Sequence, residues 1–283
     1  MSEPPQSDPS RPWSVVTGAS AGLGADFARQ LAAQGRSVIL AARRVDRLET
    51  LAAELQETYG VSTEVVSVDL AEREGPATLF ERSTSEGRQI DLLVNNAGFG
   101  ALGAHLETPG ERHLQMLDLN VTALTDLTHR FASHMLEHGL PSHVVNIASL
   151  AGRMPVAGLA SYVASKHAVV GLSASVRLEL LGSGVTLGTI CPTAVDTRLA
   201  SGISHAGLMA VEPVDVAEAV VESWETRTPE IVVPKVLGPL TRLHNALPDR
   251  VQGRIRRMLN ADRVLTGVDE AARDAYEQDV LAS

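Results

Sequence analysis

The sequence predicts an α/β fold, a single doubly wound domain built on a mostly parallel, seven-stranded sheet. Three observations predict it. Seven short apolar runs rich in β-branched residues recur along the chain, longer segments with helical periodicity lie between them, and a glycine-rich turn follows the first run. Strands that alternate with helices form βαβ units, which build a parallel sheet with helices on both faces.

The expected strands cover residues 14–16, 37–41, 63–68, 91–95, 143–147, 185–190 and 230–234. The clearest expected helices span Asp46–Tyr59, Glu111–Leu136 and Ser161–Leu181. No linker or internal repeat interrupts the alternation, which favours one domain over residues 13–237. We expect the proline-rich residues 1–12 to form a short disordered lead. Residues 238–283, first basic and then acidic, are expected to form a helical extension.

Composition narrows the class of protein. The chain of 283 residues is 44% hydrophobic and 20% charged, which is typical of a globular protein. Its net charge of -10 and its 3% aromatic residues argue against nucleic acid as a partner. Cys191 is the only cysteine, which excludes an intrachain disulfide. With no signal-peptide pattern and no apolar run of about 18 residues, we expect a cytoplasmic protein without a spanning membrane segment.

The glycine-rich turn "TGASAGLG" covers residues 17–24. Glycines let the backbone approach a ligand closely, and the N-terminus of the following helix attracts a pyrophosphate. The spacing Gly-x-x-x-Gly-x-Gly differs from the commoner dinucleotide fingerprint, and such a turn can also be a plain tight connection. Its position at the first strand–helix junction favours a Rossmann-type nucleotide site, formed by Gly18, Ser20, Gly22, Leu23 and Gly24.

Two arginines at the end of the second strand distinguish between cofactors. An NAD site usually has an acid there, whereas an NADP site favours arginine. Here Arg43 and Arg44 take this place, and the next acid is Asp46. Guanidinium groups suit the extra phosphate through charge-assisted hydrogen bonds. The alternative is a pair of solvated arginines at the start of a helix, but we expect NADP(H) as the cofactor.

The stretch "SYVASK", Ser161 to Lys166, places a tyrosine and a lysine four residues apart. On a helix, Tyr162 and Lys166 would share one face. A free tyrosine has a pKa of about 10, and a nearby cation lowers this value by favouring the phenolate. The pair is thus suited to proton exchange, although the stretch alone also fits a surface tyrosine beside a solvated lysine.

Taken together, these motifs resemble the short-chain dehydrogenase/reductase family, of the classical type, from about Trp13 to Val236. The motifs that carry the resemblance are "TGASAGLG", the "VD" at Val68–Asp69, "NNAG" at Asn95–Gly98, Asn120 in "LDLNV", Ser149 in "NIAS", and "YVASK". The resemblance implies an NADP-dependent alcohol dehydrogenase or carbonyl reductase.

The resemblance also implies a role for each residue. Tyr162 would exchange a proton with the reacting oxygen, and Ser149 would donate a hydrogen bond to that oxygen. Lys166 would lower the pKa of Tyr162 and hold the nicotinamide ribose, and Asn120 would help to anchor a water that links Lys166 to solvent. Further cofactor contacts are implied at Asp69, Leu70, Asn96, Ala97, Gly98, Pro192 and Thr197.

One position departs from the family pattern. "CPTAVDT" keeps Pro192 and Thr197 but has Thr193 where the family usually has glycine. If that position required a positive φ, threonine would be strained there. The alternative is a loop conformation that tolerates a β-branched residue.

The expected substrate is a small apolar secondary alcohol or its ketone. The mostly small or apolar segment Ala194–Val211 follows the sixth strand, at the sheet edge where ligands bind. The expected opposite wall contains Met154, Val156 and Leu159, and burial of apolar surface favours a substrate of the same kind. An acyl-thioester whose phosphates meet Arg198 is one alternative. A redox sensor that binds NADP without turnover is another, but it would not require Ser149, Tyr162 and Lys166 together.

Two further signals have simpler interpretations. "HMLEH", His134 to His138, matches a His-x-x-Glu-His zinc pattern, but it ends a helix just before Gly139, so we expect no metal site. The basic amphipathic stretch Leu240–Leu259 is expected to pack on its own core or on a second subunit of a homo-oligomer. Contact with a membrane surface and a cap over the substrate remain alternatives.

Overall fold

The computed structural model describes residues 13–195 and 211–258; residues 1–12, 196–210 and 259–283 are outside the described part. Every run predicted as a strand is a strand, with bounds that differ from the predicted ones by at most two residues. The strands are β1 Trp13–Thr17, β2 Ser37–Ala42, β3 Thr63–Ser67, β4 Ile90–Asn95, β5 Ser142–Ile147, β6 Val185–Pro192 and β7 Glu230–Val233.

The seven strands form one sheet in the order β3-β2-β1-β4-β5-β6-β7, and neighbouring strands pair in parallel throughout. The order reverses between β1 and β4, which is the doubly wound arrangement that the alternation of strands and helices predicts. Ligands of such sheets bind outside the carboxyl ends of the strands at this reversal point.

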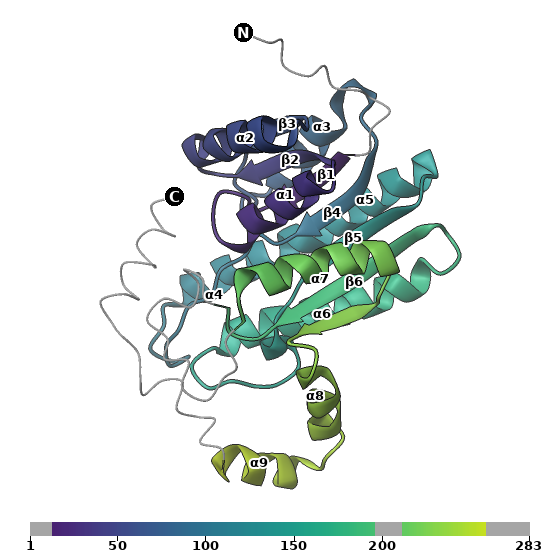
Figure 1. The fold of residues 1–283 in the computed structure, drawn as a ribbon. Coiled ribbons are helices and arrows are strands. Elements are labelled where there is room, and N and C mark those ends of the chain that lie inside the picture. Colours follow the sequence, from purple (N-terminus) through teal and green to yellow (C-terminus); the bar gives the residue numbers. More distant parts are fainter. Residues whose placement is uncertain (1–12, 196–210, 259–283) are drawn as a thin grey trace.

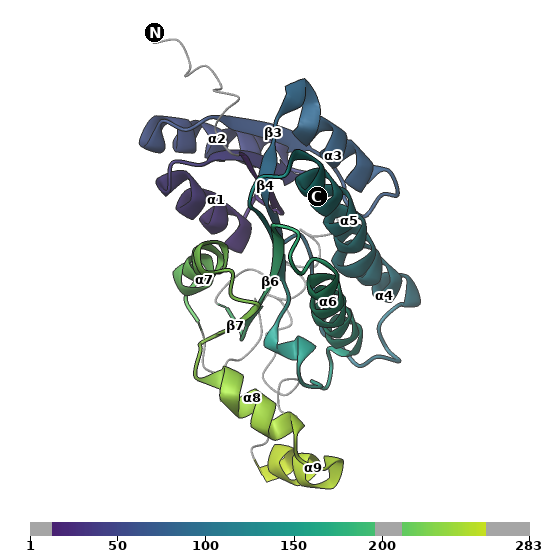
Figure 2. The same cartoon turned by 90° about the vertical axis from the view of Figure 1, so that its right-hand side faces the viewer.

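Helices cover both faces of the sheet, with α1, α2 and α7 on one face and α3, α5 and α6 on the other (Figure 2). Each face has its own apolar core, centred on the fully buried Phe27 on one side and Phe131 on the other. The strands read as continuous apolar runs because both of their faces are covered. The helices are α1 Leu23–Ala33, α2 Val45–Tyr59, α3 Gly75–Thr84, α4 Gly110–Leu117, α5 Leu124–His138, α6 Ala160–Glu179 and α7 Pro213–Thr226.

The predicted helix Glu111–Leu136 is present, but it is not one regular helix. A π-helical turn, Asp118–Ala123, separates α4 from α5. Such turns are rare and are found most often at functional sites, because the extra residue changes the direction in which a side chain points. Here the turn contains Asn120, one of the residues expected at the catalytic site.

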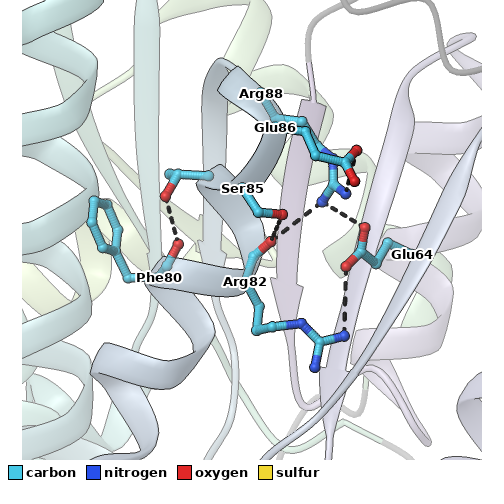
Figure 3. A network of polar contacts seen from close by, with 7 residues as sticks. Glu64, Phe80, Arg82, Ser85, Glu86 and Arg88 are labelled. Carbon is cyan, nitrogen blue, oxygen red and sulfur yellow. Dashed lines mark hydrogen bonds and ion pairs between the residues drawn. The ribbon is translucent and has the colours of Figure 1, made fainter.

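A network of charged side chains fastens the edge strand β3 to the end of α3 (Figure 3). Glu64 of β3 pairs with Arg88 at 2.5 Å and with Arg82 at 3.8 Å, and Arg88 also lies 3.5 Å from Glu86. The side chains of Arg82 and Glu86 are largely exposed, so their pairs contribute at most about 1 kcal/mol each, whereas Arg88 and Glu64 are mostly buried.

Two short helices, α8 Leu237–Asn245 and α9 Asp249–Met258, follow the last strand and extend away from the sheet (Figure 1). Gly238 and Thr241 of α8 are buried, and the amide of Asn245 donates to the carbonyl oxygen of Arg153 at 2.8 Å. The Asn245 bond fastens α8 to the loop that follows β5. None of the helices within residues 13–195 and 211–258 is long and apolar enough to cross a membrane.

Candidate active site

The residues predicted for the site come from separate parts of the chain. Most of them follow the carboxyl ends of the strands, which lie on the same side of the parallel sheet (Figure 1). Thr197 lies outside the described residues. The others are Gly18, Ser20, Gly22, Leu23 and Gly24 after β1, Arg43 and Arg44 after β2, Asp69 and Leu70 after β3, Asn96, Ala97 and Gly98 after β4, Asn120 in the π-helical turn, Ser149 after β5, Tyr162 and Lys166 on α6, and Pro192 at the end of β6.

The glycine-rich turn requires glycine at three positions. Gly18 has a φ of 68° and Gly22 a φ of 54°, a conformation that residues with a side chain rarely adopt. Gly24, at the start of α1, lies so close to this turn that a Cβ would be 2.2 Å from the carbonyl oxygen of Gly18. No side chain caps the N-terminus of α1. The turn therefore presents backbone N–H groups to its surroundings, a suitable arrangement for binding a phosphate.

Thr17, which we did not predict as a site residue, fastens this turn to the end of β4. Its hydroxyl accepts hydrogen bonds from the N–H groups of Asn96 at 2.9 Å and Ala97 at 3.0 Å. The side-chain amide of Asn96 donates in return to the carbonyl oxygen of Thr17 at 2.9 Å. The two loops that flank the reversal point of the sheet are thus held as one unit.

The two arginines after β2 lie beside the glycine-rich turn. Arg44 donates to the Ser20 hydroxyl from Nη2 at 3.2 Å and from Nε at 3.4 Å. Arg43 is partly exposed and pairs with Asp69 at 3.5 Å. Asp69 also accepts a hydrogen bond from the N–H of Ala71 at 2.9 Å. This arrangement places two guanidinium groups at the side of a phosphate-binding turn.

Asn120 is almost completely buried and uses both ends of its amide. Its Oδ1 accepts from the N–H of Phe99 at 3.0 Å, and its Nδ2 donates to the carbonyl oxygen of Phe99 at 2.9 Å. Nδ2 also donates to the Ser165 hydroxyl at 3.1 Å, and this hydroxyl donates to the carbonyl oxygen of Tyr162 at 2.7 Å. The π-helical turn thereby joins the loop after β4 to the first turns of α6.

Lys166 is buried, with 6% of its surface exposed, and its Nζ lies 5.7 Å from the centre of the Tyr162 ring. Nζ donates to the carbonyl oxygen of Ile147, the last residue of β5, at 2.9 Å. Burial lowers the pKa of Lys166 to about 8, although the nearby Cys191 acts in the opposite direction. The amine therefore remains mostly charged at neutral pH.

Ser149 lies two residues after Ile147 and begins the short 3-10 helix Leu150–Gly152. Its hydroxyl accepts from the N–H of Ala151 at 3.1 Å and donates to the carbonyl oxygen of Pro192 at 3.4 Å. Ser149, Ile147 and Lys166 are therefore neighbours at the carboxyl end of β5. The combination of "NIAS" and "YVASK" predicts a shared site for Ser149, Tyr162 and Lys166, and their common role stays a prediction.

Thr193 is not strained in the place of the usual glycine. The only non-glycine residues with positive φ among the described ones are Glu86 and Arg227. The N–H of Thr193 donates to the carbonyl oxygen of Val233 at 2.9 Å, which continues the pairing of β6 with β7. Of the two conformations considered for this loop, the one that tolerates a β-branched residue is observed.

The histidines of "HMLEH" lie at the C-terminal end of α5, where they contact the first residue of β4. His134 Nε2 accepts from the N–H of Ile90 at 3.3 Å, and His138 Nε2 donates to its carbonyl oxygen at 3.1 Å. Burial, followed by the neighbouring His138, lowers the pKa of His134. No group of three or more His, Cys, Asp or Glu residues that could hold a metal occurs in the described ranges.

The known proteins described next, to which the chain is similar, are dehydrogenases and a ketoreductase. The chain is 35% identical over 217 residues to 1-deoxy-11-beta-hydroxypentalenate dehydrogenase of Streptomyces exfoliatus, covering 75% of this chain and 78% of that protein. A short-chain dehydrogenase from Sphingobium yanoikuyae, solved with NADPH, is similar with a TM-score of 0.73 and 30% identity, over 84% of this chain and 97% of that one.

A variant of actinorhodin polyketide ketoreductase, solved with NADPH, is similar with a TM-score of 0.71 and 31% identity, over 76% of this chain and 91% of that one. The family described as short chain dehydrogenase matches residues 12–207, which is more than half of the chain. The matched range contains the glycine-rich turn, the π-helical turn and the first turns of α6. The chain therefore belongs to the short-chain dehydrogenase family.

Proposed function

We propose that the protein is an NADP(H)-dependent oxidoreductase that interconverts an apolar secondary alcohol and its ketone. The observation that carries the proposal is the position of Lys166, a buried cation 5.7 Å from the centre of the Tyr162 ring. Burying an ammonium group is costly unless it is paired and hydrogen-bonded, and Lys166 donates to the Ile147 carbonyl oxygen. A cation beside a tyrosine favours the phenolate, which is the form that accepts a proton.

The residues around the glycine-rich turn fit a phosphorylated dinucleotide. The uncapped N-terminus of α1 suits the pyrophosphate, and the close approach of Gly24 to Gly18 excludes side chains that would block it. Arg44, held beside Ser20, and Arg43 would bind the 2′-phosphate that distinguishes NADP from NAD. When bound, the nicotinamide ring supplies or accepts the hydride.

The protein's own groups would handle the oxygen and its proton. Tyr162 would donate a proton to the carbonyl oxygen in reduction and remove it from the alcohol in oxidation. Ser149, held by Ala151 and Pro192, would donate a hydrogen bond to the same oxygen and orient it. Lys166 would keep the tyrosine acidic enough and bind the ribose hydroxyls.

Asn120 would help to anchor the water that connects Lys166 with solvent. Asn120 would also have a positioning role. Its amide forms hydrogen bonds with Phe99 and Ser165, and these bonds fix the first turns of α6 against the π-helical turn. A shift of α6 would move Tyr162 and Lys166 together. Positioning of this kind affects rate strongly, because a displacement of about 1 Å can cost on the order of a hundredfold.

An apolar substrate is supported by the composition of the two segments that follow β5 and β6. Met154, after β5, packs against an apolar cluster, and Val195 and Val211, at the two ends of the segment after β6, are buried in the apolar core and pair with each other. The similarity to 1-deoxy-11-beta-hydroxypentalenate dehydrogenase supports an alcohol as the substrate. Leu199, Ile203, Leu208 and Met209 of that segment, and Arg198, lie outside the described residues.

The second candidate is reduction of a 3-oxoacyl thioester, which is favoured by the similarity to a polyketide ketoreductase. A panel of aryl and alicyclic ketones, acetoacetyl thioesters and free sugars, assayed by loss of NADPH absorbance, separates the candidates. We expect the highest kcat/KM with the apolar ketones. A preference for sugars or charged keto acids would contradict the proposal, and NADPH binding without any turnover would indicate the redox sensor.

We also propose that the protein is a homo-oligomer. Leu114 of α4 and Leu178 of α6 are large apolar residues whose surfaces are 62% and 69% exposed, and Leu181 beyond α6 is 74% exposed. Apolar side chains on neighbouring helices of this kind often mark contacts between subunits. A monomeric mass by light scattering at assay concentration would contradict this assignment.

A further inference from the structure

The loop between β4 and α4, residues 99–109, lies against the catalytic helix α6. It leaves the carboxyl end of β4, and a Cβ placed on Gly100 would be 3.2 Å from Cδ2 of Tyr162. The N–H of Gly103 donates to the carbonyl oxygen of Gly158, in the loop that precedes α6, at 3.0 Å. The backbone of this loop therefore forms one side of the space in front of the tyrosine.

A single imidazole makes a further connection between this loop and α6. His113 of α4 has its Nδ1 2.8 Å from the hydroxyl of Ser161, the residue immediately before Tyr162. Its Nε2 is 3.1 Å from the carbonyl oxygen of His105, in the middle of the loop. The rings of His105 and His113 also lie against each other, with centres 4.4 Å apart.

The chemistry of the partners fixes the direction of one hydrogen bond and, for the neutral ring, of the other as well. A carbonyl oxygen can only accept, so Nε2 of His113 carries its hydrogen and donates to His105. In the neutral ring Nδ1 is then the acceptor, and the Ser161 hydroxyl donates to it. The connection thus runs from α6 through the imidazole to the loop, with each donor meeting an acceptor.

We propose that His113, through Ser161 and the His105 carbonyl group, is a positioning residue that holds the 99–109 loop against α6 and so sets the affinity for the carbonyl substrate. The inference rests on the proposed function, because it takes Tyr162 as the proton donor. His113 acts at a distance from the reacting oxygen, since its contacts are to Ser161 and His105. Its loss should therefore affect substrate binding more than cofactor binding.

The test has one arm that does not depend on activity. In His113→Phe, which keeps a ring of similar size, and in Ser161→Ala, hydrogen exchange of the 99–109 loop should become about three- to tenfold faster, the equivalent of one ordinary hydrogen bond. Ser161→Thr keeps a hydroxyl and should restore protection. The matched control is His167→Phe, because His167 is an exposed histidine on α6 whose ring contacts only the Val163 carbonyl oxygen of its own helix among the contacts described.

The second arm measures kinetics with the best ketone. In His113→Phe and Ser161→Ala the KM for the ketone should rise about three- to tenfold, while kcat changes less than twofold and the NADPH dissociation constant is unchanged. The double variant should be no worse than either single variant, because both remove the same connection. Additive effects, or a loss confined to kcat or to NADPH binding, would overturn the proposal.

The two arms separate failure of this inference from failure of the proposed function. If the native protein reduces no ketone in the presence of NADPH, the proposed function fails, but the exchange arm still decides whether His113 holds the loop. If native activity is normal and exchange in the 99–109 loop is the same in all variants, the proposed function stands and the role of His113 is refuted.

Discussion

Asn120 and Phe99 exchange two hydrogen bonds: the N–H of Phe99 donates to the Asn120 side chain at 3.0 Å, and the Asn120 amide donates back to the Phe99 carbonyl oxygen at 2.9 Å. This pairing imitates the ladder between two strands, although one partner is a side chain. It satisfies both backbone groups of a buried residue that follows the "NNAG" motif. The same amide reaches Ser165 on α6.

Asn120→Leu should destabilise the fold by about 2–4 kcal/mol, because it leaves the buried N–H and C=O of Phe99 without partners. Urea denaturation measures this free energy of unfolding. The control is Asn245→Leu, which removes only exposed hydrogen bonds, to Arg153 and to the neighbouring His244, and should cost less than about 1 kcal/mol. Equal costs in the two variants would show that the pairing with Phe99 contributes little.

Tyr162→Phe should lower kcat by about a thousandfold, since it removes the acidic proton and leaves the ring in place. The NADPH dissociation constant, measured by fluorescence titration, should stay within about twofold of the native value. Tyr59→Phe, at the end of α2, is the control and should be fully active. Substantial turnover by the Tyr162 variant would disprove the proton path.

Arg44→Gln and Arg43→Gln should each weaken NADPH binding by about 1.5–3 kcal/mol, the contribution of a hydrogen bond to a charged group, and should leave NADH binding nearly unchanged. Arg44 should have the larger effect, because it also contacts Ser20 of the glycine-rich turn. Arg47→Gln, in the first turn of α2, is the control. An unaltered preference for NADPH over NADH would mean that another group binds the 2′-phosphate.

Lys166→Met tests how the free energy of unfolding depends on pH. The pKa of Lys166 is about 8 in the folded protein and about 10.4 in an unfolded chain. Between these values the unfolded state holds the proton and the folded state does not, so the stability of the native protein rises with pH across this window.

Relative to the Lys166→Met variant, the native protein should therefore gain on the order of 2–3 kcal/mol between about pH 7 and about pH 10.5. Urea denaturation at several pH values measures this difference. Lys235→Met, which alters a largely exposed lysine paired with Glu222, is the control and should show no comparable trend. A constant difference between native protein and the Lys166 variant would mean that the buried amine does not titrate in this range.

The sequence was sufficient to predict the sheet, and it also placed the proposed site residues beside the carboxyl ends of the strands, for a physical reason. Strands covered on both faces, such as β4, appear as unbroken apolar runs, and the glycines of the first turn mark a backbone that residues with a side chain cannot adopt. Tyr162 and Lys166 share a helix face because of the helical repeat alone.

Other features could not be read from the sequence. The π-helical turn at Asn120 changes backbone hydrogen bonds while the apolar periodicity of Glu111–Leu136 hardly changes, so the pattern predicts a regular helix. The contact between His113 and Ser161 joins residues 48 positions apart, and only tertiary packing brings them together. The conformation at Thr193 likewise depends on its hydrogen bond to β7.

The last prediction compares Gly24, which lies in α1 at the end of the glycine-rich turn, with Gly171 in α6. Gly24→Ala should strongly disrupt the protein, because its Cβ would be 2.2 Å from the carbonyl oxygen of Gly18 and 2.8 Å from the Asn96 amide, and the oxygen belongs to a rigid turn. Relief of this overlap would move α1 away from the turn, which should weaken NADPH binding more than tenfold and cost about 2–4 kcal/mol of stability.

Gly171→Ala in α6 is the matched control, since a Cβ there has no atom within 4 Å. Alanine favours a helix over glycine by about 1 kcal/mol, so this variant should be slightly more stable than the native protein and bind NADPH normally. Thermal unfolding and NADPH titration of the two variants decide the matter. If Gly24→Ala behaved like Gly171→Ala, the close contact between α1 and the turn would not be needed to form the phosphate site.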